Sequence, residues 1–598
     1  MGKIHADDKE SKLIRSVFIS SVLTLFAQNM AAYAGQIVDG AIISKFLGAS
    51  SMAAFQLESP FNMFLTMLSQ LFFIGVQGFC AQRLGAGKKD EATSAYTTSV
   101  FLLGGISIAI AVVTLLQAGP IGIALGASGT QAALLDDLKQ YIIGFAFCIP
   151  AFCLGPVMVS VLFLEGKGRV VIRSLLLQSA VDVALDLVNV FVAHQGMFGM
   201  GLSTTFCYYI AIIYMAVARR KGAIAVRLEP SSFKLSVMKY VFRLGLPAGV
   251  DHAYKAVRTL VLNTVLASIA VSAAIAAYGS INILNCFFHA VTSGIGTAVL
   301  TMTAIFYGER DKRSIERLMK FALAVTLGVE LAIAAISFIG APLIMRLLTE
   351  SGDTETLEIS TVALRIFVLS LPLFGINFVN QKYYNSTGNR VLVYVLSALD
   401  NLIFICMFAA VLGKLFQYKG VFLAFAAAEL CTLIVNIVFI IVKLKRLPRG
   451  FGDCLSLPGE FDIPDSMQYT ASATTKEEVI AISGDVHRFC MENGMNDKDA
   501  MWFSLAVEEL GMNFIRWGMS KKKKESMDIR LHKTDSWVLR IRDDCGSFDP
   551  TNWLSLHQDE SAVKNIGIRM VLGGSKDVSY VSAMKTNTVI ITYNRDGG

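Results

Sequence analysis

The sequence predicts an all-α polytopic membrane protein that ends in a smaller α+β domain. Three observations predict this fold class. Apolar residues make up 54% of the 598-residue chain and charged residues only 17%. Before residue 450 the apolar residues gather in long runs, and a bilayer span needs about 20 of them in succession. After residue 450 the runs give way to a mixed polar and apolar pattern, which is typical of a soluble domain.

The membrane part divides into twelve apolar runs whose flanking charges alternate. We expect spans near 16–38, 51–79, 95–117, 139–164, 170–193, 199–219, 238–266, 274–305, 317–346, 361–384, 391–413 and 418–444. One set of span ends carries 28 Lys and Arg residues and the opposite set carries six. Because basic residues gather at the cytoplasmic ends of spans, we predict a multi-pass protein of the cell membrane with both termini in the cytoplasm.

The two halves of the membrane part resemble each other in their small residues. Three pairs of turns match at an offset of about 220 residues: Gly85-Ala86-Gly87 with Tyr307-Gly308-Glu309, Gly168 with Gly388, and Gly199 with Gly420. A shared offset predicts two parallel repeats of six helices with a cleft between them. We place an N-lobe at 1–222 and a C-lobe at 223–449.

The remaining sequence reads as a linker and a soluble domain. Residues 450–468 are rich in Gly, Pro and acidic residues, which predicts a linker. In 469–598, amphipathic helices are expected at 476–493 and 497–517, and alternating strands at 526–533, 536–543 and 586–594. This order predicts an α+β domain of two layers, a sheet and a layer of helices.

The charge of the chain argues against nucleic acid as a partner. Residues 1–450 hold 36 basic and 24 acidic side chains, whereas 451–598 hold 17 and 22. The basic excess therefore belongs to the membrane part, where loop charge sets orientation. The ten cysteines show no CxxC or Cys/His ligand spacing, and most read as small buried apolar residues.

Carboxylates within the predicted spans are the first functional candidates. Asp39 closes the first span, and Asp182 and Asp186 lie four residues apart on one face of the fifth. An ionisable group at the centre of a span costs about 2.5–3.5 kcal/mol on insertion scales. Carboxylates that share a cavity disfavour each other's ionisation, so they can hold a proton or chelate a cation. The alternative is a structural polar cluster bonded to Asn189 or Thr204.

Residues 15–445 resemble the multidrug and toxic compound extrusion (MATE) family of transporters. The resemblance rests on Ile37-Val38-Asp39, Phe46-Leu47-Gly48-Ala49, Leu84-Gly85-Ala86-Gly87-Lys88-Lys89, Gly199-Met200-Gly201 and Leu244-Gly245-Leu246-Pro247-Ala248-Gly249. It implies an exporter of small organic compounds, often cations. Exchange for H⁺ or Na⁺ would drive export by alternating access of the two lobes.

The resemblance also implies a cation site in the N-lobe. By position, the site residues would be Asp39, Asp182, Asp186 and Thr204. Asp182 replaces an Asn that is usual in the family, and the extra carboxylate favours the proton as the coupling ion. Another branch has a C-lobe Glu where this chain has Lys255, so that carboxylate site is expected to be absent.

Charged residues in the seventh span form a second candidate group. Asp251 and Lys255 are spaced for an i,i+4 salt bridge, and Arg258 lies about one turn further on. They either neutralise each other structurally or line a cavity, where the cations would suit an anionic substrate. His289, Glu330, Asp400 and Glu429 are single polar residues of spans, for which structural roles are expected.

The C-terminal domain carries a series of polar motifs. Glu509 and Asn513 share one face of a predicted helix, where a carboxylate can orient water and an amide oxygen can bind Mg²⁺. A predicted strand ends in Asp543-Asp544-Cys545-Gly546, and Gly567 opens a later helix whose N–H groups can hold phosphate.

In order and spacing, these motifs resemble the histidine-kinase-type ATPase fold, in its branch of anti-sigma-factor serine kinases. The resemblance covers about 470–595 and implies ATP and Mg²⁺ as cofactors. It makes Glu509 the catalytic or water-orienting residue, Asn513 the Mg²⁺ ligand, and Asp543 the adenine-reading residue, with Asp544 as the alternative register. Gly546 and Gly567 would belong to the nucleotide loops. Departures from the family pattern at Trp517, Cys545 and Asn565 leave turnover of ATP open.

Three functions remain open from the sequence. The leading hypothesis is a cation-coupled exporter with a nucleotide-binding regulatory domain. The second is a membrane-anchored serine kinase or partner-switch protein, whose partner would be a cytoplasmic regulatory protein. The third is a flippase of lipid-linked oligosaccharides, which Lys255 and Arg258 would suit. The chain contains no GxxxxGK[ST] motif, so an ATP-driven pump of the P-loop type is not predicted.

Overall fold

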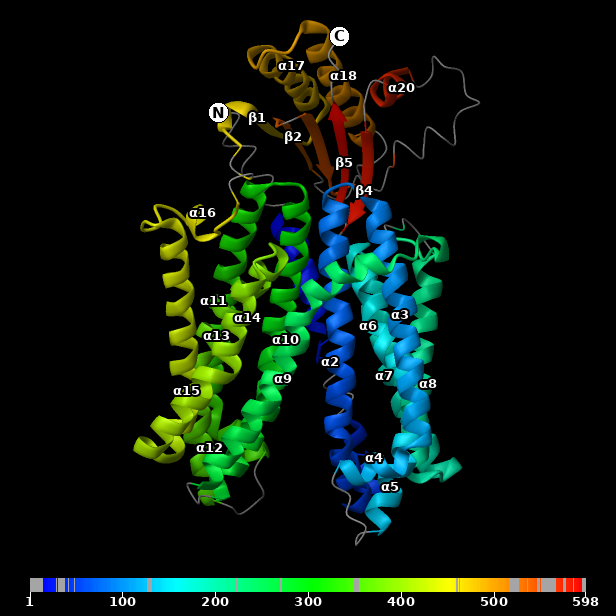
Figure 1. Cartoon of the computed structure of the whole chain (residues 1–598), viewed down its shortest axis with the longest axis vertical. Coiled ribbons are helices and arrows are strands. Elements are labelled where there is room, and N and C mark those ends of the chain that lie inside the picture. The colour runs from blue at the N-terminus through cyan, green and yellow to red at the C-terminus, as the bar shows by residue number, and fades with distance from the viewer. Residues whose placement is uncertain are drawn as a thin grey trace.

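The molecule consists of a long helical body with a small domain at one end (Figure 1). The computed structural model describes residues 14–27, 29–30, 38–40, 42–47, 49–125, 132–220, 224, 226–268, 272–348, 354–458, 461, 463–515, 526–534, 536–545, 549, 566–573, 577–583 and 586–593. The expected site residue Gly546 and the departures at Trp517 and Asn565 lie outside these ranges.

The helical body forms two groups of helices that stand side by side (Figure 1). We call them the first and the second bundle. After a helical segment at 14–27, the first bundle contains η1 (Ile43–Leu47), α2 (Ala49–Gly85), α3 (Lys89–Leu116), α4 (Ala118–Ala124), α5 (Ala132–Ala146), α6 (Ile149–Leu164), α7 (Gly168–Val188), η2 (Asn189–Ala193) and α8 (Gly196–Arg219). The second bundle contains α9 (Met238–Ser268), α10 (Ser272–Gly308), α11 (Lys312–Leu348), α12 (Thr354–Phe367), η5 (Val368–Ser370), α13 (Leu371–Ser386), α14 (Arg390–Ala398), η6 (Leu399–Ile403) and α15 (Phe404–Leu444). Two short turns, η3 (Pro230–Ser232) and η4 (Leu235–Val237), precede α9.

The body is a polytopic membrane structure. Within the described residues, eight helices are long and apolar enough to cross a bilayer, or nine if the bent pair α5 and α6 forms one span. The prediction of twelve spans differs from this count for identifiable reasons. The first predicted span lies partly outside the described residues, and the charged helix α9 is not among the eight. The last two predicted spans run into one element, which breaks at Gln417 with φ 52°.

The two bundles meet along a seam where α2 packs against α9 and α10. Glycines bring the helix backbones together there: a Cβ at Gly75 would lie 2.5 Å from the Val241 carbonyl oxygen, and one at Gly245 would lie 1.8 Å from the Leu71 carbonyl oxygen. Small residues permit such close approach of membrane helices. Across the same seam, Gln77 Nε2 donates to Thr301 Oγ1 over 2.8 Å.

The C-terminal domain has a sheet covered by helices on one face. Its antiparallel strands follow the order β1-β2-β3-β5-β4, with β1 (Gln468–Ala473), β2 (Met527–Lys533), β3 (Trp537–Asp543), β4 (Asp577–Ala583) and β5 (Thr586–Tyr593). Helices α17 (Lys476–Glu492) and α18 (Asp497–Asn513) lie on the side of the sheet away from the body, and α20 (Ile566–Gly573) lies beside α18 (Figure 1). Strands β1 and β4 were not among the expected elements, whereas α20 is the helix that was expected to open at Gly567.

Alternation along the strands explains which face the helices cover. Ile529 and Leu531 of β2 and Ile541 of β3 enter the core with Phe503 and Leu510 of α18. In the register of the sheet, Ile529 pairs with Ile541. A capping box at Thr475 fixes the start of α17. The predicted two-layer arrangement is therefore present.

The stretch predicted as a linker packs against the second bundle. It contains α16 (Phe451–Cys454) and η8 (Asp465–Met467). Leu455 and Phe461 are buried among residues of the body. The Tyr383 hydroxyl donates to the Leu455 carbonyl over 2.6 Å, and the Phe461 ring lies 4.8 Å from that of Tyr307. These apolar side chains, set in a polar stretch, fix the path of the chain between the body and the domain.

Candidate functional site

The structure brings the three predicted carboxylates of the first bundle together. Asp182 and Asp186 of α7 are 8% and 1% exposed, and both lie within electrostatic reach of Asp39. Asp182 is bonded to Cys207 and Asp186 to Ser203, both on α8. In each of the three carboxyl groups, Oδ1 is buried without a hydrogen-bond partner.

Unsatisfied carboxyl oxygens define what this cluster can do chemically. A buried polar atom without a partner is costly, and clustered carboxylates repel each other when ionised. The group is therefore stabilised when it takes up protons or a cation. No set of three or more His, Cys, Asp or Glu side chains within the described residues is arranged to hold a metal ion.

The side chains of Thr204 and Asn189 form hydrogen bonds with backbone groups outside the carboxylate cluster. Thr204 Oγ1 donates to the Met200 carbonyl within its own helix over 3.2 Å, while the Thr204 carbonyl accepts from the Cys207 thiol over 3.1 Å. Asn189 stabilises the turn between α7 and α8, donating to the Gly196 carbonyl and accepting from the backbone N–H of Gln195. The Thr204 hydroxyl is thus hydrogen-bonded within its own helix.

Glu58 is a further carboxylate near this cluster that the sequence analysis did not single out. It lies in α2, is 3% exposed, and its Oε1 has no hydrogen-bond partner. The buried Tyr141 on α5 is within electrostatic reach of Glu58, Asp39 and Asp182. The signal was present in the sequence, since an acidic residue inside an expected span needs a reason.

In the second bundle, the predicted pair of Asp251 and Lys255 is formed. Lys255 Nζ lies 2.8 Å from Asp251 Oδ2. Asp251 Oδ1 also accepts hydrogen bonds from Asn401 and Ser397, over 2.8 and 3.2 Å. Arg258 is 9% exposed and lies over the Phe425 ring, 5.9 Å from its centroid. These contacts join α9 to α14, η6 and α15.

Asp400 and Glu429 form a pair, although the sequence analysis treated them as single residues. They are 3% and 5% exposed and hydrogen-bonded to each other. Gln381 donates to Asp400 over 3.0 Å, and Asn377 donates to Glu429 over 2.8 Å. A carboxylate carries no donor, so the bond between two carboxyls requires a proton. No local sequence pattern links residues on η6 and α15 that are this far apart in the chain.

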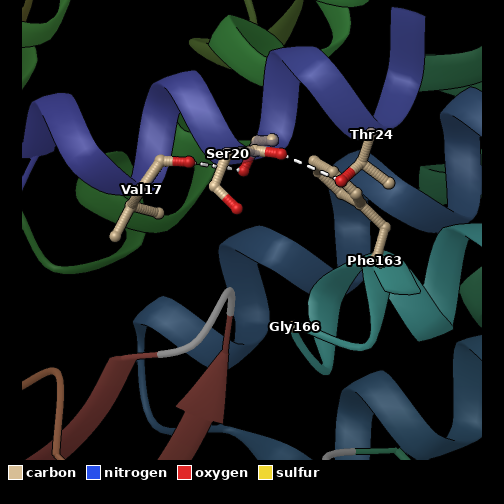
Figure 2. A pocket seen from close by; sticks show the side chains of 7 residues that line it. Val17, Ser20, Thr24, Phe163 and Gly166 are labelled. Atoms are coloured by element: carbon tan, nitrogen blue, oxygen red, sulfur yellow. Dashed lines mark hydrogen bonds between the residues drawn. The ribbon is translucent and has the colours of Figure 1, made fainter. Parts of the chain in front are cut away.

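A small cavity lies between the first helix and the turn from α6 to α7. Figure 2 shows Val17, Ser20 and Thr24 on the first helix facing Phe163 and Gly166. Its volume of about 20 Å³ suits a water molecule rather than an organic substrate. The cavity is therefore separate from the carboxylate cluster and is not a substrate site.

In the C-terminal domain, Asp543 is a buried carboxyl group at the end of β3. Its side chain is 0% exposed. Oδ1 accepts from Asn587 Nδ2 and from the Cys545 backbone N–H, each over 2.9 Å, whereas Oδ2 has no partner. Burial raises the pKa of Asp543 to about 7, against the hydrogen bonds that favour its charged form. An open acceptor in such a place fits a donor group of a ligand.

Glu509 and Gly567 are brought into contact by α18 and α20. A Cβ at residue 567 would lie 2.1 Å from Glu509 Cδ, so glycine is needed for the carboxyl group to lie there. Asn513 Nδ2 donates to the Glu509 carbonyl over 2.7 Å. Asp544 Oδ1 accepts from the Ser526 backbone N–H over 2.9 Å, tying the ends of β2 and β3 together. Of the two neighbours, Asp543 is the one with a buried carboxyl oxygen that lacks a partner.

Comparisons with known proteins match the helical body. The family model described as MatE matches residues 24–188 and 247–409. The chain is 25% identical to the multidrug export protein MepA of Staphylococcus aureus (strain MSSA476), over 67% of this chain and 87% of that protein. It is 24% identical to MepA of Staphylococcus haemolyticus (strain JCSC1435), with the same shares covered.

Solved structures show the same fold. A transporter of the MOP superfamily from Pyrococcus furiosus, whose title reports a binding pocket of reversed polarity, aligns with a TM-score of 0.66 and 20% identity over 73% of this chain and 99% of that chain. An outward-facing multidrug resistance MATE transporter aligns with a TM-score of 0.66 and 19% identity over 71% and 95%. The family match covers more than half of the chain in two similar blocks, one in each bundle, and the chain belongs to the MATE family of membrane transporters.

Proposed function

We propose that the protein is a cation-coupled exporter of small organic compounds, with a C-terminal domain that binds nucleotide and regulates export. The observation that carries the coupling is the cluster of Asp39, Asp182 and Asp186, each with one buried oxygen that lacks a partner. The curated relatives, named multidrug export proteins, support the substrate class.

Proton uptake by the cluster links the coupling ion to the shape of the first bundle. Ionised, the three carboxylates repel one another; protonated, they can donate to a neighbour and pack closely. Asp182 and Asp186 reach α8 through Cys207 and Ser203. A change in protonation therefore alters how α7 packs against α8. The two bundles would expose substrate alternately to the two sides of the cell membrane, with the basic ends of the helices and both termini in the cytoplasm.

The test is gradient-driven transport of ethidium in membrane vesicles with an imposed pH or Na⁺ gradient. Asp39→Asn and Asp186→Asn should each abolish ethidium movement while the protein still reaches the membrane. Asp136→Asn is the matched control, because Asp136 is an exposed carboxylate of α5. Full activity in both cluster variants would refute coupling at this site.

The nucleotide site rests on the open Oδ2 of Asp543 and on the contact between Glu509 and Gly567. Mg·ATP fits these residues: Asp543 would accept from the adenine amine, Asn513 would hold Mg²⁺, and Glu509 would orient a water or hydroxyl nucleophile. The bound nucleotide would supply a transferable phosphoryl group. Calorimetry on the full chain with Mg·ATP should show binding that Asp543→Ala weakens roughly 10–150-fold, the value of a charge-assisted hydrogen bond. An absence of heat at millimolar Mg·ATP would remove nucleotide from the proposal.

A further inference from the structure

Six charged side chains are buried between the C-terminal sheet and the second bundle. Arg540 Nη1 lies 2.9 Å from Glu309 and also contacts Asp311, while its Nη2 contacts Asp528. Arg542 contacts Glu309, and Arg530 lies 3.7 Å from Asp311. These side chains are between 2% and 5% exposed. Three arginines face three carboxylates in these contacts.

The electrostatics of the network show that it is held as charged pairs. Burial opposes ionisation of Asp311, but Arg530, Arg540 and Arg542 outweigh it and lower the pKa of Asp311. His532 lies on the same face of the sheet, and burial together with the arginines lowers its pKa to about 3. His532 is therefore neutral at physiological pH and adds no charge to the network.

The domain is fixed to the second bundle by a second set of contacts as well. Arg530 donates to the Arg310 carbonyl, and Arg313 of α11 donates to Thr470 of β1 over 3.2 Å. The segment between α15 and β1 is itself held, since Leu455 and Phe461 are buried against the body. The domain is thus attached to the second bundle both by charged pairs and by apolar packing.

Contact with the first bundle carries no charged pair in the described residues. It is made by β4, an edge strand of the sheet, and its neighbour β5. A Cβ at Gly87, in the turn between α2 and α3, would lie 2.3 Å from Ser579 Oγ and 4.0 Å from Ile590 Cδ1. Val581 is 6% exposed and packs into the core of the first bundle. The two contacts of the sheet thus differ in kind, since the contact with the second bundle is charged and the contact with the first is not.

The sheet rests on equivalent places of the two repeats. Gly87 follows α2, and Glu309 follows α10, the helix that matches α2 at an offset of about 220 residues. The strands lie above the ends of the two bundles (Figure 1). Beneath them, α2 and α10 are in backbone contact through Gly85 and Gly308. Any movement that separates the two bundles at this end must break either the contact at Gly87 or the charged network.

We propose that the C-terminal domain is an autoinhibitory latch: anchored on the second bundle, its strand β4 closes over the Gly87 turn and holds the domain-facing ends of the two bundles together. The consequence for transport rests on the proposed function, in which the bundles must part at this end. The uncharged contact, at Gly87, is the one that opens. The charged network keeps the domain on the second bundle throughout.

The latch has a direct connection to the candidate nucleotide site. Helix α20, which begins at the Gly567 contact with Glu509, ends at Gly573, and β4 begins at Asp577. A ligand that displaces α20 therefore acts on the strand that touches Gly87. Asp543 ends β3, and Val589 lies in β5. Because β3, β5 and β4 are consecutive in the sheet, both residues are connected through it to the edge strand β4.

Ser579→Trp tests the latch in the full-length protein in detergent. Ser579 lies on the body-facing side of β4, opposite the side on which Val578 and Tyr580 meet the domain core. The larger side chain should push β4 off Gly87 and leave the fold of the domain intact. Hydrogen–deuterium exchange should become about tenfold faster in peptides covering 80–89 and 303–311, which form the contact of α2 with α10. Peptides of α17 should keep their protection.

Asp577→Trp is the matched control, because Asp577 lies on the same side of the same strand but is exposed. It should leave exchange at 80–89 and 303–311 unchanged. Exchange that rises only within 577–593 in Ser579→Trp, with the helix contact still protected, would overturn the latch. Ethidium efflux should be faster in Ser579→Trp than in the control. If no form of the protein moves ethidium, the proposed transport function fails, while the exchange data still decide whether the latch exists.

Discussion

Gly85 and Gly308 occupy reciprocal positions at the contact between α2 and α10. A Cβ at 85 would lie 2.2 Å from the Ile305 carbonyl oxygen, and a Cβ at 308 would lie 2.2 Å from the Gln82 carbonyl oxygen. Gly85 thus faces the residue three positions before Gly308, and Gly308 faces the residue three positions before Gly85. This is the contact pattern of a two-fold axis. Gln77 and Thr301, which bond to each other across 224 positions of sequence, belong to the same seam.

The first prediction concerns this backbone contact. Gly308→Ala should force α2 and α10 apart and lower the unfolding free energy by about 1–3 kcal/mol, because the contacting atoms are backbone and cannot rotate away. Thermal unfolding of the purified protein measures it. Gly328→Ala in α11 is the control, since a Cβ there meets nothing within 4 Å. That change should be neutral or stabilise the helix by up to about 1 kcal/mol. Equal behaviour of the two variants would contradict the close contact.

The second prediction concerns the buried charges between sheet and body. Glu309→Arg should destabilise attachment of the domain by about 3–5 kcal/mol, because it leaves Arg540 and Arg542 buried without their common partner. Limited proteolysis of the segment 450–468 in the full-length protein should then be faster. Adding Arg542→Glu should restore much of the protection by re-forming a pair with reversed sign.

The exposed pair of Asp485 and Arg488 provides a control for that experiment. Its side chains are 48% and 73% exposed and lie 3.7 Å apart. Reversing both charges there should change proteolysis little, since exposed pairs contribute about 0–1 kcal/mol. If reversing the charges of Asp485 and Arg488 accelerated proteolysis as much as Glu309→Arg does, burial of the charged network would not explain its effect on attachment of the domain.

The third prediction separates the carboxylates of the first bundle. Asp182→Asn should reduce proton-driven ethidium transport less than Asp186→Asn, because an amide at 182 retains an acceptor for Cys207 and leaves two carboxylates to take up protons. The same change should raise transport driven by Na⁺ relative to H⁺.

Glu58→Gln should shift the pH dependence of transport if Glu58 titrates with the cluster through Tyr141. Vesicle assays at several pH values measure all three variants, and an unaltered profile in Glu58→Gln would confine the cluster to the three aspartates.

The fourth prediction concerns the pH dependence of nucleotide binding. The pKa of Asp543 is raised to about 7, and an adenine amine donates to the ionised carboxylate. As the pH falls below about 7, Asp543 becomes protonated, and affinity for Mg·ATP should fall by up to tenfold per pH unit. Asp543→Asn should bind more weakly and lose this dependence, whereas Asp544→Asn should retain it. Calorimetry at about pH 6, 7 and 8 is the measurement. A flat profile in the unmodified protein would rule out a contact with ionised Asp543.

Much of the architecture could be predicted from residue patterns. The long apolar runs predicted the helices, and the shared offset of the Gly85 and Gly308 turns predicted that the halves are related. The alternation of Ile529 and Leu531 with charged residues predicted a strand with two different faces. Asp182 and Asp186 were placed on one helical face by their spacing alone. These features depend on local periodicity, which the sequence carries directly.

The tertiary structure decided which distant residues meet. Asp400 and Glu429 read as isolated polar residues, yet they share a hydrogen bond, and Tyr141 lies within electrostatic reach of both Glu58 and Asp182, which are on different helices. Arg530, Arg540 and Arg542 alternate with apolar residues along their strands, and they are buried on Glu309 and Asp311. Burial of a charge depends on whether a partner from elsewhere in the chain balances it. Local sequence determined the helices, the strands and their faces, whereas the packing of bundles and sheet alone decided that the charged face of the sheet is an anchor.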